Sequence, residues 1–205
     1  MTTLLGVYGA GGCGRGILPL VRASSLVDEE CVFVDDNGSA QSINGARRLT
    51  FAQFAEHRGE RRICLAVANG RVRQVLDDRC RGAGIDFLTA RASEHVEMDD
   101  VQIGEGALIS PYTVVTSNVR IGRHFHLNLY SYVEHDCVIG DFVTFAPSVR
   151  CNGNVHIGDG AYIGSGAVIR QGLKVGAGAT IGMGAVVTKN VPAGETWIGN
   201  PARRM

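Results

Sequence analysis

An apolar residue recurs at every sixth position through the second half of the chain. Fifteen successive positions at this spacing are all apolar, although only 45% of the residues in the chain are hydrophobic. We call them the inward positions: Ile103, Ile109, Val115, Ile121, Leu127, Val133, Ile139, Phe145, Cys151, Ile157, Ile163, Ile169, Val175, Ile181 and Val187. A random sequence of this composition would not hold such a register, so the period reflects a repeated structure.

A period of six with one aliphatic side chain and a tight turn is typical of a parallel β-helix with a triangular cross-section. Each hexapeptide forms one side of the triangle, so the fifteen inward positions correspond to about five coils. The residue two places before an inward position is small or apolar, as at Ala107 and Ala161. We therefore expect the inward side chains of successive coils to stack into a dry core.

The first ninety or so residues show a different pattern, in which strand-like and helix-like segments alternate as in an α/β unit. The glycine-rich run "GAGGCGRG" follows the first of the strand-like segments. Strands are predicted at 4–8, 31–36, 61–70 and 85–88, and helices at 17–25 and 71–84. This is about half of a dinucleotide-binding fold, so its size favours a single nucleotide. We expect an α/β domain at 1–92 and a β-helix domain at 93–205.

Composition and charge exclude several classes of function. Twenty basic residues balance twenty acidic ones, which leaves no excess of positive charge for binding nucleic acid. No apolar run approaches the roughly 20 residues of a membrane helix, and the N-terminus lacks a signal-peptide pattern, so we expect a cytoplasmic protein. The six cysteines have no metal-binding spacing, and we expect them to be reduced thiols without disulfides.

Three polar residues, Glu134, His135 and Asp136, interrupt the small and apolar residues of the repeat. Position alone leaves three interpretations open: a solvated turn, a metal site, or an acid–base pair.

A resemblance to a known family narrows this choice. The matching segments are "YGAGGCG", "FVDD", "LAVANGRVR", "VEHDCVIGDF", "CNGNVHIG" and "IGNPARRM", which together cover nearly the whole chain. With these segments the chain resembles the left-handed β-helix acyltransferases, and within them the bacterial nucleotide-sugar N-acetyltransferases grouped with the sialic acid O-acetyltransferases. The resemblance implies an α/β, half-Rossmann-like N-terminal domain followed by an all-β, left-handed parallel β-helix. It also implies a homotrimer that transfers acetyl from acetyl-CoA to the amino group of a nucleotide-linked amino-deoxysugar.

The resemblance implies that His135 is the general base and that Asp136 orients its ring. An imidazole with a pKa near neutrality can take the proton of an attacking amine and return it to the thiolate leaving group. Glu134 is the weaker partner because neighbours on an extended side point in opposite directions. Similar proteins contact acetyl-CoA, between two subunits of the trimer, at the positions of Thr144, Ser165 and Met183.

In the N-terminal domain, the resemblance implies that the glycine-rich loop approaches the diphosphate of the nucleotide sugar. The residues implied are Gly11, Gly12 and Cys13 in that loop, Asp35 and Asp36 as acceptors for base or ribose, and the Ala68–Asn69 turn, which closes the pocket. Similar proteins commonly have histidine at the position of Cys13 and often glycine at that of Ala68. These departures leave the identity of the sugar nucleotide open.

Several alternatives remain at this point. The glycine-rich turn followed by acidic residues is also compatible with an NAD(P) site. O-acetylation of a sugar hydroxyl and a non-catalytic nucleotide-sugar-binding protein are the other functions. Cys137 and Cys151 could be thiol nucleophiles, but their places in the repeat favour core packing.

A zinc site built from histidines of neighbouring subunits is a further alternative, and the candidates are His124, His126, His135 and His156. Against it, His126 and His156 each come one residue before an inward position, where side chains tend to face solvent. We therefore predict no bound metal.

Overall fold

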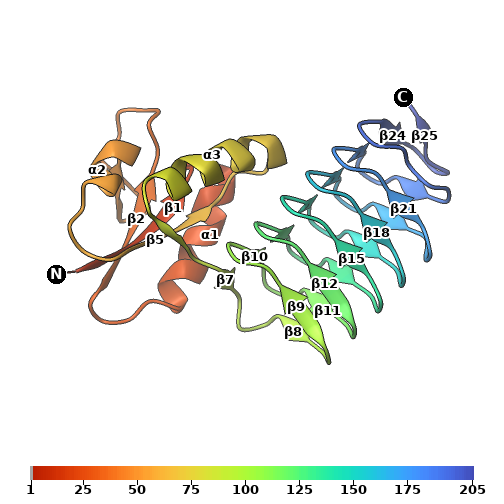
Figure 1. Cartoon of the computed structure of the whole chain (residues 1–205), viewed down its shortest axis with the longest axis horizontal. Coiled ribbons are helices and arrows are strands. Elements are labelled where there is room, and N and C mark those ends of the chain that lie inside the picture. The colour runs from red at the N-terminus through yellow and green to blue at the C-terminus, as the bar shows by residue number, and fades with distance from the viewer. Residues whose placement is uncertain (1) are drawn as a thin grey trace.

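The computed structural model describes residues 2–205, which form an α/β domain followed by a parallel β-helix, with the two chain ends at opposite ends of the molecule (Figure 1). No helix among these residues combines the length and the apolar character that crossing a membrane requires.

The α/β domain is built on a six-stranded sheet in the order β3-β4-β2-β1-β5-β6. Neighbouring strands are parallel, except that β3 and β4 form an antiparallel hairpin. The strands are β1 (Thr3–Tyr8), β2 (Glu29–Val34), β3 (Ser42–Ile43), β4 (Ala46–Leu49), β5 (Arg61–Leu65) and β6 (Asp86–Phe87), and the helices are α1 (Gly12–Ala23), α2 (Phe51–Ala55) and α3 (Gly70–Gly82).

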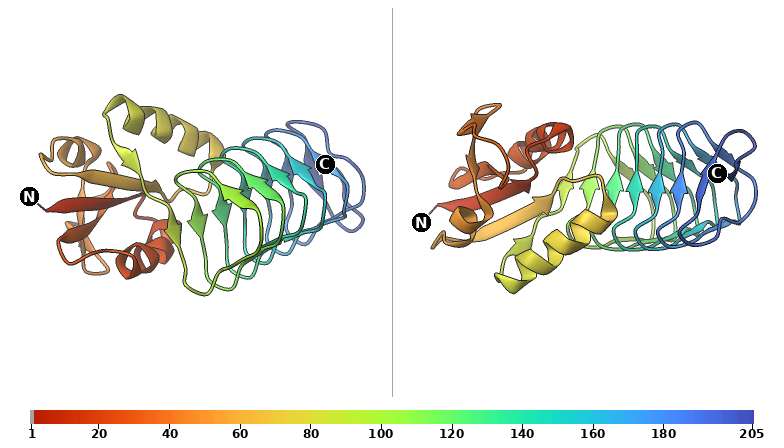
Figure 2. Two further views of the ribbon diagram at one scale, coloured as in Figure 1. Left: turned by 60° about the horizontal axis from the view of Figure 1, so that its bottom comes forward. Right: turned by 90° about the horizontal axis from the view of Figure 1, so that it is seen from above.

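Helices cover both faces of this sheet (Figure 2). Ile17 and Val21 of α1 pack with Phe33 on one face, and Phe54 of α2 and Cys80 of α3 pack against the other. All of these side chains are buried, so the sheet has an apolar core on each side. The burial of both faces explains why the strands have near-continuous apolar runs rather than alternating ones.

The predicted elements are all present, with corrections to their ends and number. β5 ends at Leu65 rather than at residue 70, because Asn69 caps α3, and α1 begins at Gly12, inside the glycine-rich run. The prediction of four strands and two helices contained too few elements, because it omitted the β3–β4 hairpin and the five-residue helix α2. These elements are too short for a hydrophobic period to reveal them.

The β-helix confirms the six-residue register. Fifteen successive strands each end at an inward position, and all the inward side chains except that of Ile103 are buried. They are β9 (Val101–Ile103), β10 (Leu108–Ile109), β11 (Val114–Val115), β12 (Val119–Ile121), β13 (His126–Leu127), β14 (Tyr132–Val133), β15 (Val138–Ile139), β16 (Thr144–Phe145), β17 (Arg150–Cys151), β18 (His156–Ile157), β19 (Tyr162–Ile163), β20 (Val168–Ile169), β21 (Lys174–Val175), β22 (Thr180–Ile181) and β23 (Val186–Val187).

Three parallel sheets form the sides of the triangle. The first side contains β10, β13, β16, β19 and β22, the second contains β11, β14, β17, β20 and β23, and the third contains β9, β12, β15, β18 and β21. We refer to them below as the first, second and third sides. The α/β domain packs on the first side, because α1 contacts β7 there and Leu108 of β10 belongs to the core of the α1 face.

The β-helix extends beyond the fifteen strands at both ends. β7 (Ala90–Arg91) and β8 (Val96–Glu97) precede them, and β24 (Thr196–Ile198) and β25 (Arg203–Arg204) follow. Strand pairing aligns Arg91 with Ile109 and Glu97 with Val115. An ion pair of 2.6 Å between Arg91 Nη1 and Glu97 Oε2 thus takes the place of apolar side chains in the first coil, which is why the period does not show it.

The corners of the β-helix adopt a left-handed backbone conformation. Nine corner residues that are not glycine have φ between 52° and 63°: Asp100, Tyr112, Asn118, His124, Tyr130, Asp136, Phe142, Ser148 and Asn154. The same corner position holds glycine at Gly106 and, from residue 160 onward, at Gly160, Gly166, Gly172, Gly178 and Gly184. Non-glycine residues adopt this conformation at an energetic cost, so a side chain at such a corner is notable.

Candidate active site

His135 lies at the corner between β14 and β15, directly before the left-handed residue Asp136. Its Nδ1 donates a hydrogen bond of 2.8 Å to Asp136 Oδ2, and Asn118 Nδ2 donates one of 3.3 Å to Asp136 Oδ1. Of the two neighbouring acidic residues, it is therefore Asp136 and not Glu134 whose carboxylate the ring contacts. Because Nδ1 carries the proton, Nε2 is left with a lone pair.

The pair is open to solvent, with the side chains of His135 and Asp136 60% and 54% exposed. The hydrogen bond to Asp136 raises the pKa of His135, and the hydrogen bonds from His135 and Asn118 lower the pKa of Asp136. The ring is thus arranged to accept a proton at Nε2 while Asp136 stays ionised and stabilises the imidazolium.

A shallow groove of about 500 Å³ surrounds this pair, and its other lining residues are Gly153, Asn154, Gln171 and Gly172. Gly153 lies under the ring, because a Cβ built on it would come within 2.6 Å of Nε2. A side chain at this position would push the imidazole out of its place, so glycine leaves the room that the ring occupies against the next coil.

The two cysteines nearby are core residues, as predicted. Cys137 and Cys151 are fully buried and belong to the central apolar cluster of the β-helix.

The residues expected to bind the nucleotide sugar lie at the carboxyl edge of the α/β sheet, in two cavities. The first, which we call the interdomain cavity, has a volume of about 410 Å³ and lies between α1 and the first side of the β-helix. Gly12, Cys13 and Ala68 line it. The second, of about 310 Å³, contains Asp35 and Asp36.

The topology of the sheet places a crevice between β1 and β5, next to the residues expected to bind the nucleotide sugar. The chain leaves β1 for α1 on one face of the sheet and leaves β5 for α3 on the other, which is where ligands bind in open parallel sheets. Gly11 is the N-cap residue of α1 and makes no side-chain cap, so the first backbone N–H groups of that helix face the crevice.

Both aspartates after β2 already hold parts of the domain together. Asp35 Oδ2 accepts a hydrogen bond of 2.8 Å from the N–H of Ala10, and Asp36 Oδ1 accepts one of 2.8 Å from the N–H of Phe51. Asp36 Oδ2 also pairs with Arg79 Nη1 at 2.6 Å. The hydrogen bond from Phe51 and the contact with Arg79 lower the pKa of Asp36. Each carboxylate oxygen keeps a second lone pair for a ligand.

Asn69 caps α3 rather than lining either cavity. Its Oδ1 accepts hydrogen bonds from the N–H groups of Arg71 at 3.0 Å and Val72 at 3.3 Å. An asparagine directly before a helix is a common cap signal, so this role is readable from the sequence.

The three residues expected to contact acetyl-CoA do not share one surface. Ser165 and Met183 are exposed on one corner of successive coils, whereas Thr144 is only 4% exposed. The hydroxyl of Thr144 donates to the carbonyl oxygen of Ala68 at 2.8 Å and accepts from Arg73 Nη1 at 2.8 Å. The α/β domain covers Thr144, so a place for it on the open surface is not supported.

The sequence patterns did not indicate that two residues, Arg73 and His126, are buried. Arg73 is fully buried, and its guanidinium also donates to the carbonyl oxygen of Phe142 at 2.6 Å, so it joins the two domains. The expectation that His126 faces solvent was wrong, because the α/β domain covers the first side, where His126 lies; it is 5% exposed. His156, on the third side, is exposed as expected.

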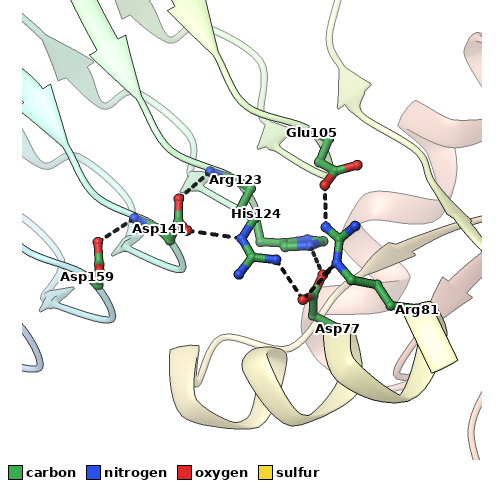
Figure 3. A network of polar contacts seen from close by, with 7 residues as sticks. All are labelled: Asp77, Arg81, Glu105, Arg123, His124, Asp141 and Asp159. Carbon is green, nitrogen blue, oxygen red and sulfur yellow. Dashed lines mark hydrogen bonds and ion pairs between the residues drawn. The ribbon is translucent and has the colours of Figure 1, made fainter.

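A second histidine–aspartate pair lies between the domains (Figure 3). His124 Nε2 donates to Asp77 Oδ1 at 2.8 Å, and Arg123 Nη1 donates to Asp77 Oδ2 at 2.8 Å. Arg81 Nε also contacts Asp77, at 3.0 Å. Asp77 and Arg81 come from α3, while His124 and Arg123 come from a corner of the β-helix, so the network attaches α3 to the β-helix. In residues 2–205 no group of three or more His, Cys, Asp and Glu side chains is placed to hold a metal ion.

Comparisons with known proteins agree with this architecture. The family model of the bacterial transferase hexapeptide (six repeats) matches residues 154–189. The chain is 46% identical to the GDP-perosamine N-acetyltransferase of Escherichia coli O157:H7, over 98% of this chain and 96% of that protein.

Solved structures extend the likeness to the whole fold. WeeI from Acinetobacter baumannii AYE superposes with a TM-score of 0.96 at 48% identity, and both chains are covered completely. The acetyltransferase domain of PglB from Neisseria gonorrhoeae FA1090, in complex with acetyl coenzyme A, superposes with a TM-score of 0.91 at 30% identity, again over both full chains. The chain therefore belongs to the bacterial hexapeptide transferases and, within that family, to the N-acetyltransferases.

Proposed function

We propose that this enzyme transfers the acetyl group of acetyl-CoA to the amino group of a nucleotide-linked amino-deoxysugar, with His135 as the general base. The observation that carries the proposal is the exposed His135–Asp136 pair, whose Nδ1–H is fixed by a carboxylate and whose Nε2 is free. The relative from Escherichia coli acts on GDP-perosamine, so a GDP-linked amino sugar is the first substrate to test.

The reaction needs no covalent intermediate on the enzyme. The substrate amine attacks the thioester carbonyl, Nε2 of His135 takes the proton of that amine, and the same nitrogen protonates the departing thiolate of coenzyme A. Asp136 holds the ring in the tautomer that leaves Nε2 as the acceptor and stabilises the imidazolium. Such a base contributes about 10²–10⁴ in rate.

The site is completed by a second copy of the chain in this proposal. His135 lies between the second and third sides, whereas the interdomain cavity lies against the first side. A closed ring of three chains brings the His135 corner of one chain next to the cavity of its neighbour. Ser165 and Met183, on the exposed corner after the first side, then contact acetyl-CoA across the same boundary.

In the nucleotide part of the site, the loop of Gly11 and Gly12 faces the diphosphate, and Asp35 and Asp36 accept hydrogen bonds from base or ribose. The interdomain cavity holds the sugar. This division follows from the two cavities on either side of the loop at the end of β1. The diphosphate between them meets the free N–H groups at the start of α1.

The test is an assay of the purified protein with acetyl-CoA and a panel of GDP-, UDP- and dTDP-linked sugars that have either an amino or a hydroxyl group at the reacting carbon. Release of free thiol measures turnover, and mass spectrometry of the product locates the acetyl group. We expect turnover with an amino sugar. Turnover only with hydroxyl sugars would instead establish O-acetylation, and nucleotide binding without turnover would indicate a non-catalytic protein.

A further inference from the structure

His126 is a buried histidine with a fixed tautomer. Its ring lies between β13 and the end of β5, where Nε2 is 2.9 Å from the carbonyl oxygen of Leu65. A carbonyl oxygen only accepts hydrogen bonds, so Nε2 must carry the proton. In the neutral ring Nδ1 is then an acceptor, and the hydrogen bond that the ring makes within residues 2–205 leaves this nitrogen unused.

The neutral form is the one present near pH 7. Burial, together with the nearby charge of Arg73, lowers the pKa of His126 well below its ordinary value of 6.5. Nδ1 therefore stays an acceptor and does not become a donor in the physiological range.

The ring lines the interdomain cavity, which has one polar and one apolar side. Ser110 and Asn128 lie near His126 on the β-helix, and the Oδ1 of Asn128 already accepts from the N–H of Leu129 at 2.9 Å, so its Nδ2 remains a donor. The apolar lining consists of Ile17, Leu20, Leu108, Pro111, Leu127 and Leu129. A deoxysugar has the matching character, with hydroxyls on one edge of the ring and a methyl group on another.

Neighbouring coils show that packing alone does not require a histidine here. Strand pairing places Leu108 and Thr144 on either side of His126 on the same face of the first side. One of these neighbours is apolar, and the hydroxyl of the other donates to Ala68 and accepts from Arg73. The imidazole in this row differs from both, because its acceptor nitrogen makes no hydrogen bond within residues 2–205.

We infer that His126 recognises the sugar of the substrate. Its Nδ1 accepts a hydrogen bond from a ring hydroxyl of the amino-deoxysugar bound in the interdomain cavity. This inference rests on the proposed function and makes His126 a specificity residue, separate from the chemistry at His135. A site built to pair with a hydroxyl rejects a substrate that lacks it, because its buried acceptor is then left without a partner.

The test is a cycle that combines variants with substrate analogues. The substrates are the amino sugar nucleotide that the wild-type enzyme turns over fastest and its analogues in which one ring hydroxyl at a time is replaced by fluorine, which cannot donate. For one analogue we expect wild-type kcat/KM to fall by about 10- to 100-fold. In His126→Phe the preference for that hydroxyl should shrink to less than about threefold, with the loss mainly in KM.

Two further variants keep the result interpretable. His126→Gln retains both a donor for Leu65 and an acceptor, so it should keep most of the hydroxyl preference even if His126→Phe is unstable. His156→Phe, an exposed histidine at the same place in the repeat, should leave kcat/KM unchanged.

The outcomes separate this inference from the proposed function. If the wild-type enzyme acetylates an amino sugar but His126→Phe discriminates between hydroxyl and fluorine as the wild type does, or His126→Gln loses this preference, the inference is wrong and the proposed function stands. If the wild-type enzyme acetylates no amino sugar, both are wrong.

Discussion

Residues 2–205 contain two histidine–aspartate pairs with the same contact distance and opposite shifts in the pKa of the histidine. His135 and Asp136 meet at 2.8 Å on an open corner, and His124 and Asp77 meet at 2.8 Å between the domains. The hydrogen bond to Asp136 raises the pKa of His135, whereas burial lowers the pKa of His124 in spite of its hydrogen bond to Asp77. A carboxylate contact therefore does not by itself make a histidine a base, because solvent access decides the direction of the pKa shift.

The two pairs differ in what surrounds the aspartate. Asp136 receives one further hydrogen bond, from Asn118, while Asp77 is buried among two arginines. Burial on its own would raise the pKa of Asp77, but the hydrogen bonds from Arg81 and His124 and the charges near it lower that pKa. The open pair is suited to exchange protons with a substrate, and the enclosed pair is suited to hold two domains together.

The largest expected effect comes from removing the open histidine. His135→Ala should lower kcat by about 100-fold to 10,000-fold, because the proton of the attacking amine loses its acceptor. Nucleotide binding, measured by thermal shift with GDP and UDP, should survive because His135 lies at the corner between the second and third sides, whereas the α/β domain packs on the first side. His124→Ala is not a suitable control, since it also breaks the interface, so the exposed His156→Ala serves instead. Unchanged activity in His135→Ala would refute the catalytic role.

Removing the buried carboxylate should act on stability instead. Asp77→Asn leaves His124 without its acceptor and Arg81 and Arg123 with reduced pairing. We expect the free energy of unfolding to fall by about 2–3 kcal/mol, below the usual range for a buried pair because both arginines are partly exposed. Urea unfolding measures this loss, and Asp78→Asn, at the next position of α3, is the control. A loss of kcat without a loss of stability would contradict the structural role.

Changing the open carboxylate should move the pH profile. The group that must be neutral is His135, whose pKa Asp136 raises, so kcat/KM of the wild type should fall below a pH that lies above 6.5. In Asp136→Asn this acid limb should move to lower pH, and kcat should drop by roughly 10- to 100-fold as the ring loses its orientation. Glu134→Gln, the other neighbour, should change little. A profile that Asp136→Asn does not shift would mean that another group sets the acid limb.

The smallest effect is the pH dependence of the interface itself. The pKa of His124 is lower in the folded chain than its ordinary value of 6.5, so below about pH 6.5 the unfolded chain binds the proton more tightly. The free energy of unfolding should therefore decrease as the pH is lowered from 7 to 5, and His124→Gln should reduce this slope. His135 has the opposite sign, since its contribution is present below pH 6.5 and is lost as the pH rises through its raised pKa. An equal slope in wild type and His124→Gln would argue against a buried neutral His124.

Much of the β-helix could be predicted from the sequence because its repeat is local. Each inward position needs only its own hexapeptide to define it, and every one of the fifteen strands ends there. The first coil was missed because Arg91 and Glu97 form an ion pair at two of its aligned positions. A hydrophobic period cannot reveal a coil in which charged residues occupy the positions that are apolar in the other coils.

The side chains between the domains could not be predicted, because their environment depends on packing between distant segments. His126 and His156 have the same place in the repeat, yet only His126 is covered by the α/β domain. Thr144 was misplaced for the same reason. The contact between His135 and Asp136 is between neighbours in the chain, so in that case the sequence held all that was needed.

The left-handed corners give the α/β domain a second role, as the cap of a solenoid. Corner residues with side chains run from Tyr112 to Asn154 and glycines occupy the corners from Gly160 onward, while α3 spans this change, with Gly70 against Gly160 and Arg71 near Gly178. In a stack whose stability is a sum over neighbouring coils, each strained corner lowers the stability of its own coil by on the order of 1 kcal/mol. The front coils, which have most of the strained corners, therefore gain more from the docked domain than the rear coils do. We therefore expect a chain without its α/β domain to fray from the front coils, toward the corner of His135.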